Sequence, residues 1–579
     1  MIRDHFRVMV VDLAAGQGRI RNLDGRNQVA GGSGLGALLF ETFGLTDQPW
    51  DDPWQPLIFA IGPLTGYFPL MSKTVCAFKS PYHDQFAESH AGGRSALSLR
   101  FADLDALVIT GRARRPSALF VGSRHLALQD VHYLWGLDVM ATGKQLRRMA
   151  GGSGHRSVLR IGPAGEAGSA MAGINVDSYR HFGRLGAGAV MGAKNLKALV
   201  VQGDASFSLP PGKAYARLFA RIHDQLTDSD MMDKYHNLGT AANVAGLNAR
   251  AALPIRNLSA TQDSDMDGIS GEAFAERTLL RNAACSGCPV GCIHIGFVRE
   301  KFMEPNQYLY RKVAYDYEPI FALGSMLGIR DPFQILALLD DAEKLGLDAM
   351  SSGVALAWAT EALLQQVITT EETLAPLEFG NLQPYRQAMD HLARGANEFY
   401  HCLTRGTQVA AAKYGGTEFA CVLGQEMAGY ATGEVFFTAQ ALGFRHSHLD
   451  TGGYGYDQKE NERDPVRAVE FLLADEQERV FLTSMVACLF ARKVYTPDLL
   501  GEALETVGYG TLAGDMQSVG AHVQHLRWKT RLATGYDPAA VAIPRRFSQV
   551  TTWKGPVDND YLGRLTRAYA EAIGALAAG

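Results

Sequence analysis

The sequence predicts an α+β protein in which a β-rich N-terminal domain precedes two mostly α-helical domains. The chain has 579 residues, more than one hydrophobic core usually holds, so several domains are expected. Short β-branched runs bounded by turn residues recur through residues 1–205, whereas from about residue 212 the apolar residues repeat with a helical period. We expect domains at residues 1–210, 211–415 and 416–579.

The strands of the first domain are predicted from five apolar runs. They are Val8–Val11, Ala106–Thr110, Ala118–Val121, Val158–Ile161 and Leu199–Val201. Each is rich in residues that favour a pleated, half-buried surface, and each ends at Gly, Pro or polar residues. Glycine-dense loops separate the runs, which suggests tight turns or close approach of the backbone to a ligand.

The helices of the later domains are predicted from apolar periodicity. Ile335, Leu336, Leu339, Ala342 and Leu345 repeat near 3.6 residues, as one face of a helix does. Residues 466–490 predict one long buried helix, or two in succession. The polar segments near 366–385 and 451–465 are predicted as loops.

Composition narrows the class of protein. Hydrophobic residues make up 47% of the chain and charged residues 20%, as in ordinary globular proteins. The net charge of −5 provides no basic field for nucleic acid. No apolar run reaches the roughly 18–20 residues of a membrane span, and the N-terminus reads as a strand rather than a signal peptide. We expect a cytoplasmic protein.

The seven cysteines are sparse and odd in number, which is not the pattern of a secreted disulfide framework. Three of them, Cys285, Cys288 and Cys292, fall within eight residues on a Gly- and Pro-containing segment. Three thiolates on so tight a turn can converge on one soft metal centre, as in iron–sulfur proteins. A cubane cluster needs a fourth ligand, and Cys488 is the candidate. Structural zinc is the alternative, with His294 as a possible ligand, but no second Cys pair is present.

Two glycine-rich segments have a functional and an ordinary interpretation. Gly32–Gly36 is either a weak phosphate loop or a tight turn against a sheet, since it lacks the dinucleotide-binding spacing. The segment 180–192 carries two arginines among glycines. It is either a phosphate site, built from guanidinium groups and backbone amides, or the glycine-rich start of a helix.

Several segments, taken in order, resemble the tungsten-dependent aldehyde:ferredoxin oxidoreductase family through most of the chain. The matching segments are 31–37, 62–66, 161–166, 188–197, the cysteine loop 285–292, Tyr317-Glu318, 345–348 and the late Cys488. The resemblance implies a β-rich base that holds a bis-pterin tungsten or, less often, molybdenum cofactor, with two helical domains closing over it. It also implies one [4Fe-4S] cluster and Mg²⁺ bridging the pterin phosphates.

The resemblance assigns expected roles to individual residues. Cys285, Cys288, Cys292 and Cys488 correspond to the cluster ligands, and Glu318 and His448 to the catalytic pair near the metal. Expected cofactor contacts are Lys73, Gly92, Gly93, Arg180, His181, Gly183, Arg184, Glu343, Gly346, Leu347, Asp348, Thr483 and Ala487. Among these, Arg180 and His181 correspond to the loop that holds pterin phosphate and magnesium.

The chain departs from the family pattern at four places. Lys73 stands where the family usually has arginine, Glu343 where it has aspartate, Thr483 where it has an acid, and Val486 where it has glycine. A neutral hydroxyl cannot match the charged, bidentate acceptance of pterin N–H groups by a carboxylate. We therefore expect the second pterin to be bound differently or less tightly, and the chain to be a divergent member.

The function implied by the resemblance is oxidation of an aldehyde to a carboxylic acid, with electrons passed to ferredoxin or to an iron–sulfur partner subunit. Two alternatives stay open. One is a non-catalytic electron-transfer or scaffold subunit, and the other is a family reductase that acts on carboxylates or aromatic thioesters. A homo-oligomer or a place in a larger complex fits each of them. The motifs do not distinguish tungsten from molybdenum or name the substrate.

Overall fold

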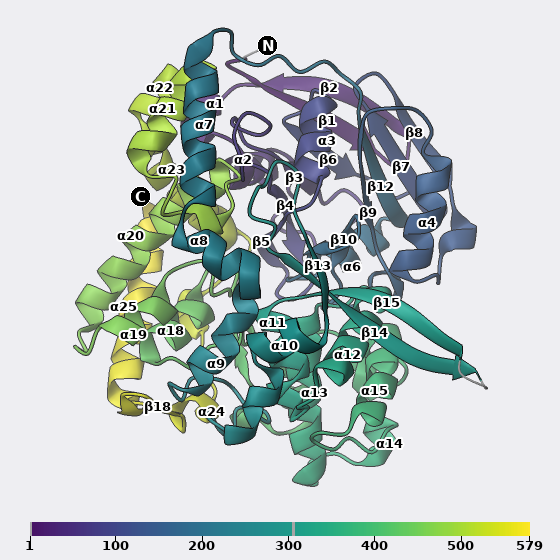
Figure 1. The fold of residues 1–579 in the computed structure, drawn as a ribbon, viewed down its shortest axis with the longest axis vertical. Helices are drawn as coiled ribbons and strands as arrows, with labels where there is room; N and C mark the ends of the chain where they lie inside the picture. The colour runs from purple at the N-terminus through teal and green to yellow at the C-terminus, as the bar shows by residue number, and fades with distance from the viewer. Residues whose placement is uncertain (1–2, 304–306) are drawn as a thin grey trace.

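The computed structural model describes residues 3–303 and 307–579. Two six-stranded sheets form the N-terminal part, and helices make up most of the remainder (Figure 1). The first sheet has the order β2-β1-β6-β3-β4-β5 and the second β11-β10-β9-β12-β7-β8. The α+β prediction, with a β-rich first part and a mostly helical remainder, is confirmed.

All five predicted strands are present. The first sheet contains β1 (Phe6–Asp12), β2 (Gln17–Leu23), β3 (Leu57–Ala60), β4 (Thr74–Ser80), β5 (Gln85–Ala91) and β6 (Ala106–Thr110). The second contains β7 (Ser117–Gly122), β8 (Leu126–Asp130), β9 (His155–Arg160), β10 (Ile174–Val176), β11 (Arg180–Phe182) and β12 (Leu196–Gly203).

Alternation along the strands explains how the two sheets are buried. On β7, Leu119 and Val121 point into a core shared with the first sheet, whereas Ala118 and Phe120 face a smaller core. The helix α4 (Val139–Met149) covers that smaller core with Leu146. Because successive side chains of a strand point to opposite faces, β7 is buried on both sides.

The segment Gly32–Gly36 forms the first turn of the helix α2 (Gly32–Phe43), so it is not the separate tight turn that the sequence allowed. Its glycines serve helix packing. A Cβ on Gly32 would lie 2.1 Å from the carbonyl oxygen of Thr483, and one on Gly34 would lie 2.8 Å from Val523. The absence of side chains therefore lets α2 lie against α20 (Pro465–Ser484) and α23 (Met516–Ala533).

The middle of the chain builds its own helical core. This core contains α11 (Tyr317–Leu323), α12 (Pro332–Leu345), α13 (Ala349–Leu364) and α15 (Leu382–Arg394). The last part packs α18 (Glu434–Leu442), α20, α23 and α25 (Asn559–Ala578) against one another. The predicted helix 466–490 is confirmed as α20 followed by a short 3₁₀ turn, Leu489–Ala491.

The loop predictions for the two polar segments were wrong in part. The first segment holds α14 (Thr370–Thr373) and the start of α15, and the second holds α19 (Gly453–Lys459). Thr369 and Glu372 cap α14 reciprocally, and such caps stabilise a short polar helix that lacks an apolar stripe.

A three-stranded antiparallel sheet interrupts the region after residue 212, where helices were predicted. It consists of β13 (Leu279–Ala283), β14 (Ile293–Met303) and β15 (Gln307–Tyr315) in that order. Backbone pairing between neighbouring strands satisfies the hydrogen-bonding groups of this segment, as a helix would have done internally.

Among the described residues, no single helix combines the length and apolar character of a membrane-crossing helix. Only the bent pair Tyr317–Leu327 and Pro332–Leu345, at 111°, meets those criteria, and it does so jointly.

Candidate active site

A cavity of about 990 Å³ lies where the N-terminal sheets meet both helical parts. That volume is at the upper end of the range of small-molecule sites. All but two of the predicted site residues line it: Lys73, Gly92, Arg180, His181, Gly183, Arg184, Cys285, Cys288, Cys292, Glu318, Glu343, Leu347, Asp348, His448, Thr483, Ala487 and Cys488. The two exceptions are Gly93 and Gly346, which shape the backbone behind the wall.

The four candidate cluster cysteines come from two distant segments. Cys285, Cys288 and Cys292 lie between β13 and β14, and Cys488 follows α20. Backbone hydrogen bonds hold the segments together: Leu70 donates to Gly287 at 3.1 Å and accepts from Cys488 at 2.9 Å. The loop can turn so tightly because Gly287 and Gly291 adopt φ of 68° and 64°, which glycine allows without strain.

Two cations stabilise negative charge on the cysteine sulfurs. Although burial favours the neutral thiol, Arg180 and Lys73 lower the pKa of Cys285. Burial disfavours the charge of Lys73, yet the Cys488 and Cys285 thiolates keep the pKa of Lys73 above its usual value. An Arg180 guanidinium nitrogen lies 3.8 Å from the sulfur of Cys292. The thiolate form that binds metal is therefore favoured at Cys285, whereas burial raises the pKa of Cys292 to about 11 and that of Cys288 to about 12.

The placement of the candidate ligands can be compared with the needs of a single zinc ion, the alternative that the sequence left open. A single tetrahedral zinc ion with bonds of about 2.3 Å needs its sulfurs within roughly 4 Å of one another. In the described part of the chain, no three His, Cys, Asp or Glu side chains are placed so as to hold one metal ion. All four thiols nevertheless line the same cavity.

Gly92 provides a test of the cysteine pocket. A Cβ on this residue would lie 2.6 Å from the Cys285 sulfur, so we expect Gly92→Ala to lower the iron content of the purified protein. Crowding of this kind typically costs about 1–3 kcal/mol. Gly183→Ala is the matched control, because nothing lies within 4 Å of a Cβ there. Equal iron in both variants would contradict the assignment of Gly92.

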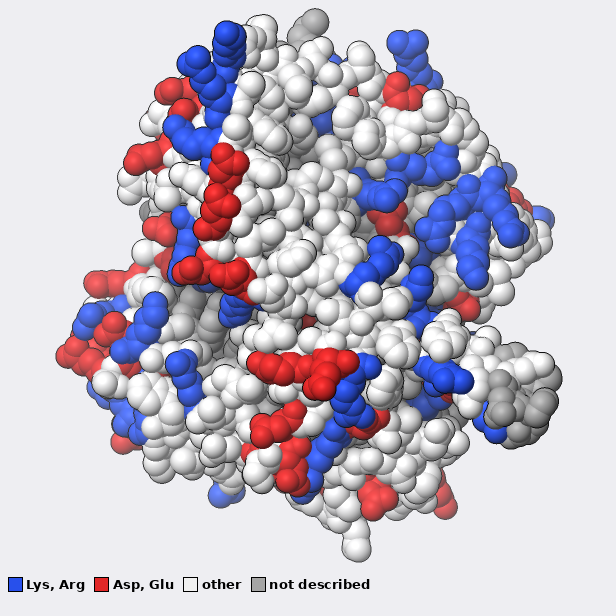
Figure 2. Space-filling model, viewed as in Figure 1, with Lys and Arg blue, Asp and Glu red and all other residues white. Residues whose placement is uncertain are grey.

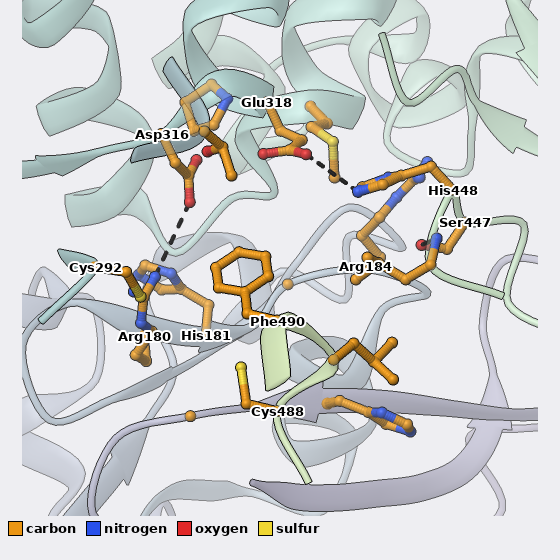
Figure 3. Close-up of a pocket in the computed structure, with 18 of the residues that line it drawn as sticks. Arg180, His181, Arg184, Cys292, Asp316, Glu318, Ser447, His448, Cys488 and Phe490 are labelled. Carbon is orange, nitrogen blue, oxygen red and sulfur yellow. Dashed lines mark hydrogen bonds and ion pairs between the residues drawn. The ribbon is translucent and has the colours of Figure 1, made fainter. Parts of the chain in front are cut away.

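Glu318 and His448 contact each other directly on the cavity wall (Figure 3). Glu318 lies on the first turn of α11, and its Oε1 is 3.1 Å from His448 Nε2. The hydroxyl of Tyr430 donates to the same oxygen at 3.2 Å, and its ring lies 5.0 Å from the His448 ring. Although burial opposes ionisation, hydrogen bonding to His448 holds the pKa of Glu318 below its usual value.

Asp316, which was not predicted from the sequence, precedes α11 and faces the same cavity (Figure 3). Its carboxylate lies 4.0 Å from Arg180. Burial, reinforced by the neighbouring Glu318 carboxylate, raises the pKa of Asp316 to about 7. The i, i+2 spacing to Glu318 was visible in the sequence, but nothing there indicated that both side chains would enter one cavity.

We expect Asp316 to make the folded protein less stable as pH rises. An acid whose pKa is higher in the folded state binds more protons when folded, so stability falls between the ordinary value and about 7. Asp316→Asn should remove this loss and gain on the order of 1 kcal/mol above pH 7, because the partly solvated carboxyl is screened. Urea unfolding at pH 5 and pH 8 measures it. An equal difference from the wild type at both values would contradict the assignment.

Charged side chains near the junction of α12 and α13 line a further part of the cavity. His181 Nε2 lies 3.1 Å from Glu343, and Arg184 Nε lies 3.7 Å from Asp348. Gly346, with φ of 76°, ends α12, and Asp348 caps α13 by accepting from Met350 and Ser351. These caps fix the carboxylates of Glu343 and Asp348 beside His181 and Arg184.

A cluster of polar side chains that was not predicted from the sequence lies around Thr483. Ser33 Oγ lies 2.9 Å from the Thr483 hydroxyl and 3.2 Å from Glu88 Oε1. Arg445 reaches His90 at 3.0 Å, and burial together with Arg445 lowers the pKa of His90 to about 4. Ser33 therefore links the buried Glu88 carboxylate to the Thr483 hydroxyl.

Val486 occupies a backbone conformation that explains the glycine expected there. Its φ is 55°, in the left-handed region that a β-branched residue rarely adopts. The side chain is fully buried, and the Val486 carbonyl accepts from the backbone of Lys73 at 3.1 Å. The turn before Cys488 thus keeps its shape without glycine, at a cost of about 1–3 kcal/mol in strain.

Unpartnered polar atoms indicate that the cavity is built for a polar group. Within the described residues, the following buried side-chain atoms of the wall have no hydrogen-bond partner: Glu88 Oε2, Arg180 Nε, His181 Nε2, Arg184 Nε and His448 Nδ1. Buried polar groups are costly to leave unpaired, so a ligand with both donors and acceptors fits here. Phosphates, N–H edges and sulfur all have complementary groups in this wall.

Two family models match nearly the whole chain. The model of the aldehyde ferredoxin oxidoreductase N-terminal domain matches residues 8–203, and that of domains 2 and 3 of the same enzymes matches residues 217–574. The chain belongs to the aldehyde ferredoxin oxidoreductase family. It is a divergent member of this family of oxidoreductases, which contains tungsten enzymes.

Individual relatives show how far the chain has diverged. The tungsten-containing aldehyde ferredoxin oxidoreductase of Pyrococcus abyssi is 29% identical over 533 residues, covering 88% of this chain and 86% of the relative. The WOR-like subunit of an aliphatic sulfonate oxidoreductase of Pyrococcus furiosus is 29% identical, covering 66% and 62%. A chain in the active-site complex of benzoyl coenzyme A reductase shares the fold, with a TM-score of 0.80, 16% identity and coverage of 98% and 95%.

Proposed function

We propose that this protein oxidises an aldehyde to a carboxylic acid on a bis-pterin tungsten or molybdenum cofactor and releases the electrons through a [4Fe-4S] cluster. The observation that carries the proposal is the meeting of four cysteines and the Glu318–His448 pair in one cavity of a chain of this family. The cysteines suit electron exit, and the pair suits proton transfer.

The wall offers complementary groups for each part of the cofactor. Arg180, His181 and Arg184 would hold the pterin phosphates and their Mg²⁺, since guanidinium groups pair well with phosphate oxygens. Glu343 and Asp348 would accept N–H groups of one pterin. Glu88, which Ser33 links to Thr483, would accept N–H groups of the second pterin, for which the Thr483 hydroxyl is a weaker acceptor. When bound, the cofactor supplies two-electron redox chemistry and polarises the substrate oxygen.

The reaction balances as aldehyde plus water giving carboxylic acid, two protons and two electrons. Glu318, held ionised by His448, would act as the base that takes a proton from the attacking water. With His448 Nε2–H donated to Glu318, the buried Nδ1 is free to accept a proton and relay it. Tyr430 fixes the carboxylate by its own hydrogen bond, so the base is oriented before the substrate arrives.

Electrons would leave through the cluster on Cys285, Cys288, Cys292 and Cys488. Lys73 and Arg180 place positive charge beside these sulfurs, which would stabilise a reduced cluster held there. Ferredoxin or an iron–sulfur subunit would accept the electrons singly. Reduced thiols in such a chain suit a reducing compartment, so a cytoplasmic location is part of the proposal.

Aldehyde-dependent reduction of a viologen dye by anaerobically purified protein tests the proposed reaction. We expect dye reduction with one or more of a panel of aliphatic and aromatic aldehydes, and carboxylate as the product. Dye reduction by no aldehyde, with cluster and pterin present, would contradict it. Reduction of a carboxylate or an aromatic thioester by reduced viologen would instead assign the chain to the reductase alternative.

A further inference from the structure

The three-stranded sheet continues directly from the cysteine loop. The strand β13 ends two residues before Cys285, and β14 begins at the residue after Cys292. Together β14 and β15 form an antiparallel ribbon, called the arm below, that projects from the body of the molecule (Figure 1). The base of the arm therefore adjoins the cysteine loop, and its outer face extends from there along β14 by about 3.3 Å per residue.

The inner face of the arm is anchored to the body. Val298 and Val313 are buried against the helical core, Arg311 pairs with Asp340 at 2.6 Å, and Glu300 pairs with Arg386 at 2.6 Å. These contacts fix the base of the arm, so its outer face is presented in one orientation. A preorganised surface loses less entropy when it binds a partner.

The outer face of the arm alternates aromatic rings and cations across the two strands. The cross-strand pairs are Phe297 with Lys312, Arg299 with Tyr310, and Lys301 with Tyr308. The Arg299 guanidinium lies 3.7 Å from the centre of the Tyr308 ring, and Tyr310 is 67% exposed. Tyrosine and arginine are the residues most enriched at the energetic centres of protein interfaces.

The charge of this face is one-sided. On the outer face of the described strands, the paired positions 295–301 and 308–314 hold no carboxylate, and Arg281 on β13 adds a further exposed cation. Neither Arg299 nor Lys312 forms an ion pair with another described residue. The whole chain carries a net charge of −5, so this positive face is a local feature.

We propose that the outer face of the arm is the docking surface for an acidic iron–sulfur electron carrier. The proposal rests on the proposed function, because the carrier takes electrons from the cluster on the adjoining cysteine loop. In each encounter the reduced cluster gives one electron to the oxidised carrier, so two encounters follow each aldehyde. A small charged surface of this kind fits the transient encounters of redox proteins, in which opposite charges speed association.

The decisive variant reverses two unpaired charges of the arm, Arg299→Glu with Lys312→Glu. With holoprotein and an acidic ferredoxin as the carrier, we expect KM for ferredoxin to rise about tenfold and its salt dependence to weaken, since rim charges act mainly on association. Reduction of a viologen dye should stay unchanged. Tyr310→Ala, which alters no charge, should raise the same KM more modestly.

A matched control changes two basic residues away from the cysteine loop. Arg147 and Arg148 are exposed on α4, over which lysines and arginines gather in Figure 2. Charge reversal there alters the net charge equally, so KM for ferredoxin should stay near the wild-type value. A rise equal to that of the arm variant would show a general charge effect and overturn the proposal.

Direct binding separates this proposal from the proposed function. Ferredoxin titrated onto immobilised holoprotein at low salt should bind the wild type and not the arm variant, whether or not an aldehyde is oxidised. Equal binding to both proteins would overturn the docking surface, and a wild type that reduces no dye would contradict only the proposed reaction. Loss of binding to single-stranded oligothymidylate, with ferredoxin binding intact, would assign the face to nucleic acid and also overturn the proposal.

Discussion

Cys488→Ala should abolish the intact cluster and with it electron transfer to ferredoxin. The residue lies on the segment after α20, held to the cysteine loop through Leu70, and it is the only one of the four cysteines from outside that loop. Without its thiolate one iron of a cubane lacks a protein ligand. We expect iron to fall below four per chain, the visible cluster absorption to fall with it, and ferredoxin reduction to drop below a hundredth of the wild-type rate.

Cys402→Ala is the control for this prediction. Cys402 is also a free thiol, but it is buried on α16 (Glu398–Leu403), does not line the cavity and contacts the Val409 carbonyl instead. Its loss should leave the iron content unchanged. Four irons per chain in Cys488→Ala would show that another group completes the cluster, and the four-cysteine assignment would then be wrong.

Glu318→Gln should lower kcat by about 10²–10⁴-fold, the range of a general base. Glutamine keeps the size of the side chain and can still accept a hydrogen bond from Tyr430 or His448, but it cannot take a proton from water. Iron and tungsten or molybdenum contents should match the wild type, because no cluster ligand is changed. Steady-state rates with an active aldehyde, set against metal content, measure this effect.

An exposed glutamate provides the comparison for Glu318. Glu371 is exposed on α14 and does not line the cavity, so Glu371→Gln should leave kcat within about twofold of the wild type, as surface substitutions usually do. If Glu318→Gln retained wild-type kcat across pH 6–8, Glu318 would not be the base. Asp316, which shares the cavity, would then be the next carboxylate to test.

The sequence predicted those features that depend on local patterns. Short β-branched runs bounded by turn residues predicted the five strands, because a strand buried on both faces is apolar along its whole length. The spacing of Cys285, Cys288 and Cys292 was by itself enough to indicate a shared soft metal centre. Cys488 was a candidate for the fourth ligand from the sequence, and the family resemblance then selected it and supplied the cavity-lining set.

Features that depend on contacts between distant segments were not predictable. Tyr430 reaches Glu318 across 112 positions, and Ser33 reaches Thr483 across 450. The glycines of α2 resembled a turn or a phosphate loop, because the helices that they allow to approach are hundreds of residues away in the chain. The outer face of the arm depends on the cross-strand register of β14 and β15, in a region where apolar periodicity predicted helices.

Elemental analysis of protein purified without oxygen tests the central claim most directly. We predict one tungsten or molybdenum and four irons per chain, with an extractable pterin. The cysteines proposed to hold the cluster and the residues proposed to contact the pterins are different residues. The iron content and the tungsten or molybdenum content therefore report on them independently. Protein that holds four irons but neither tungsten nor molybdenum would contradict the proposed oxidation and favour a non-catalytic electron-transfer subunit.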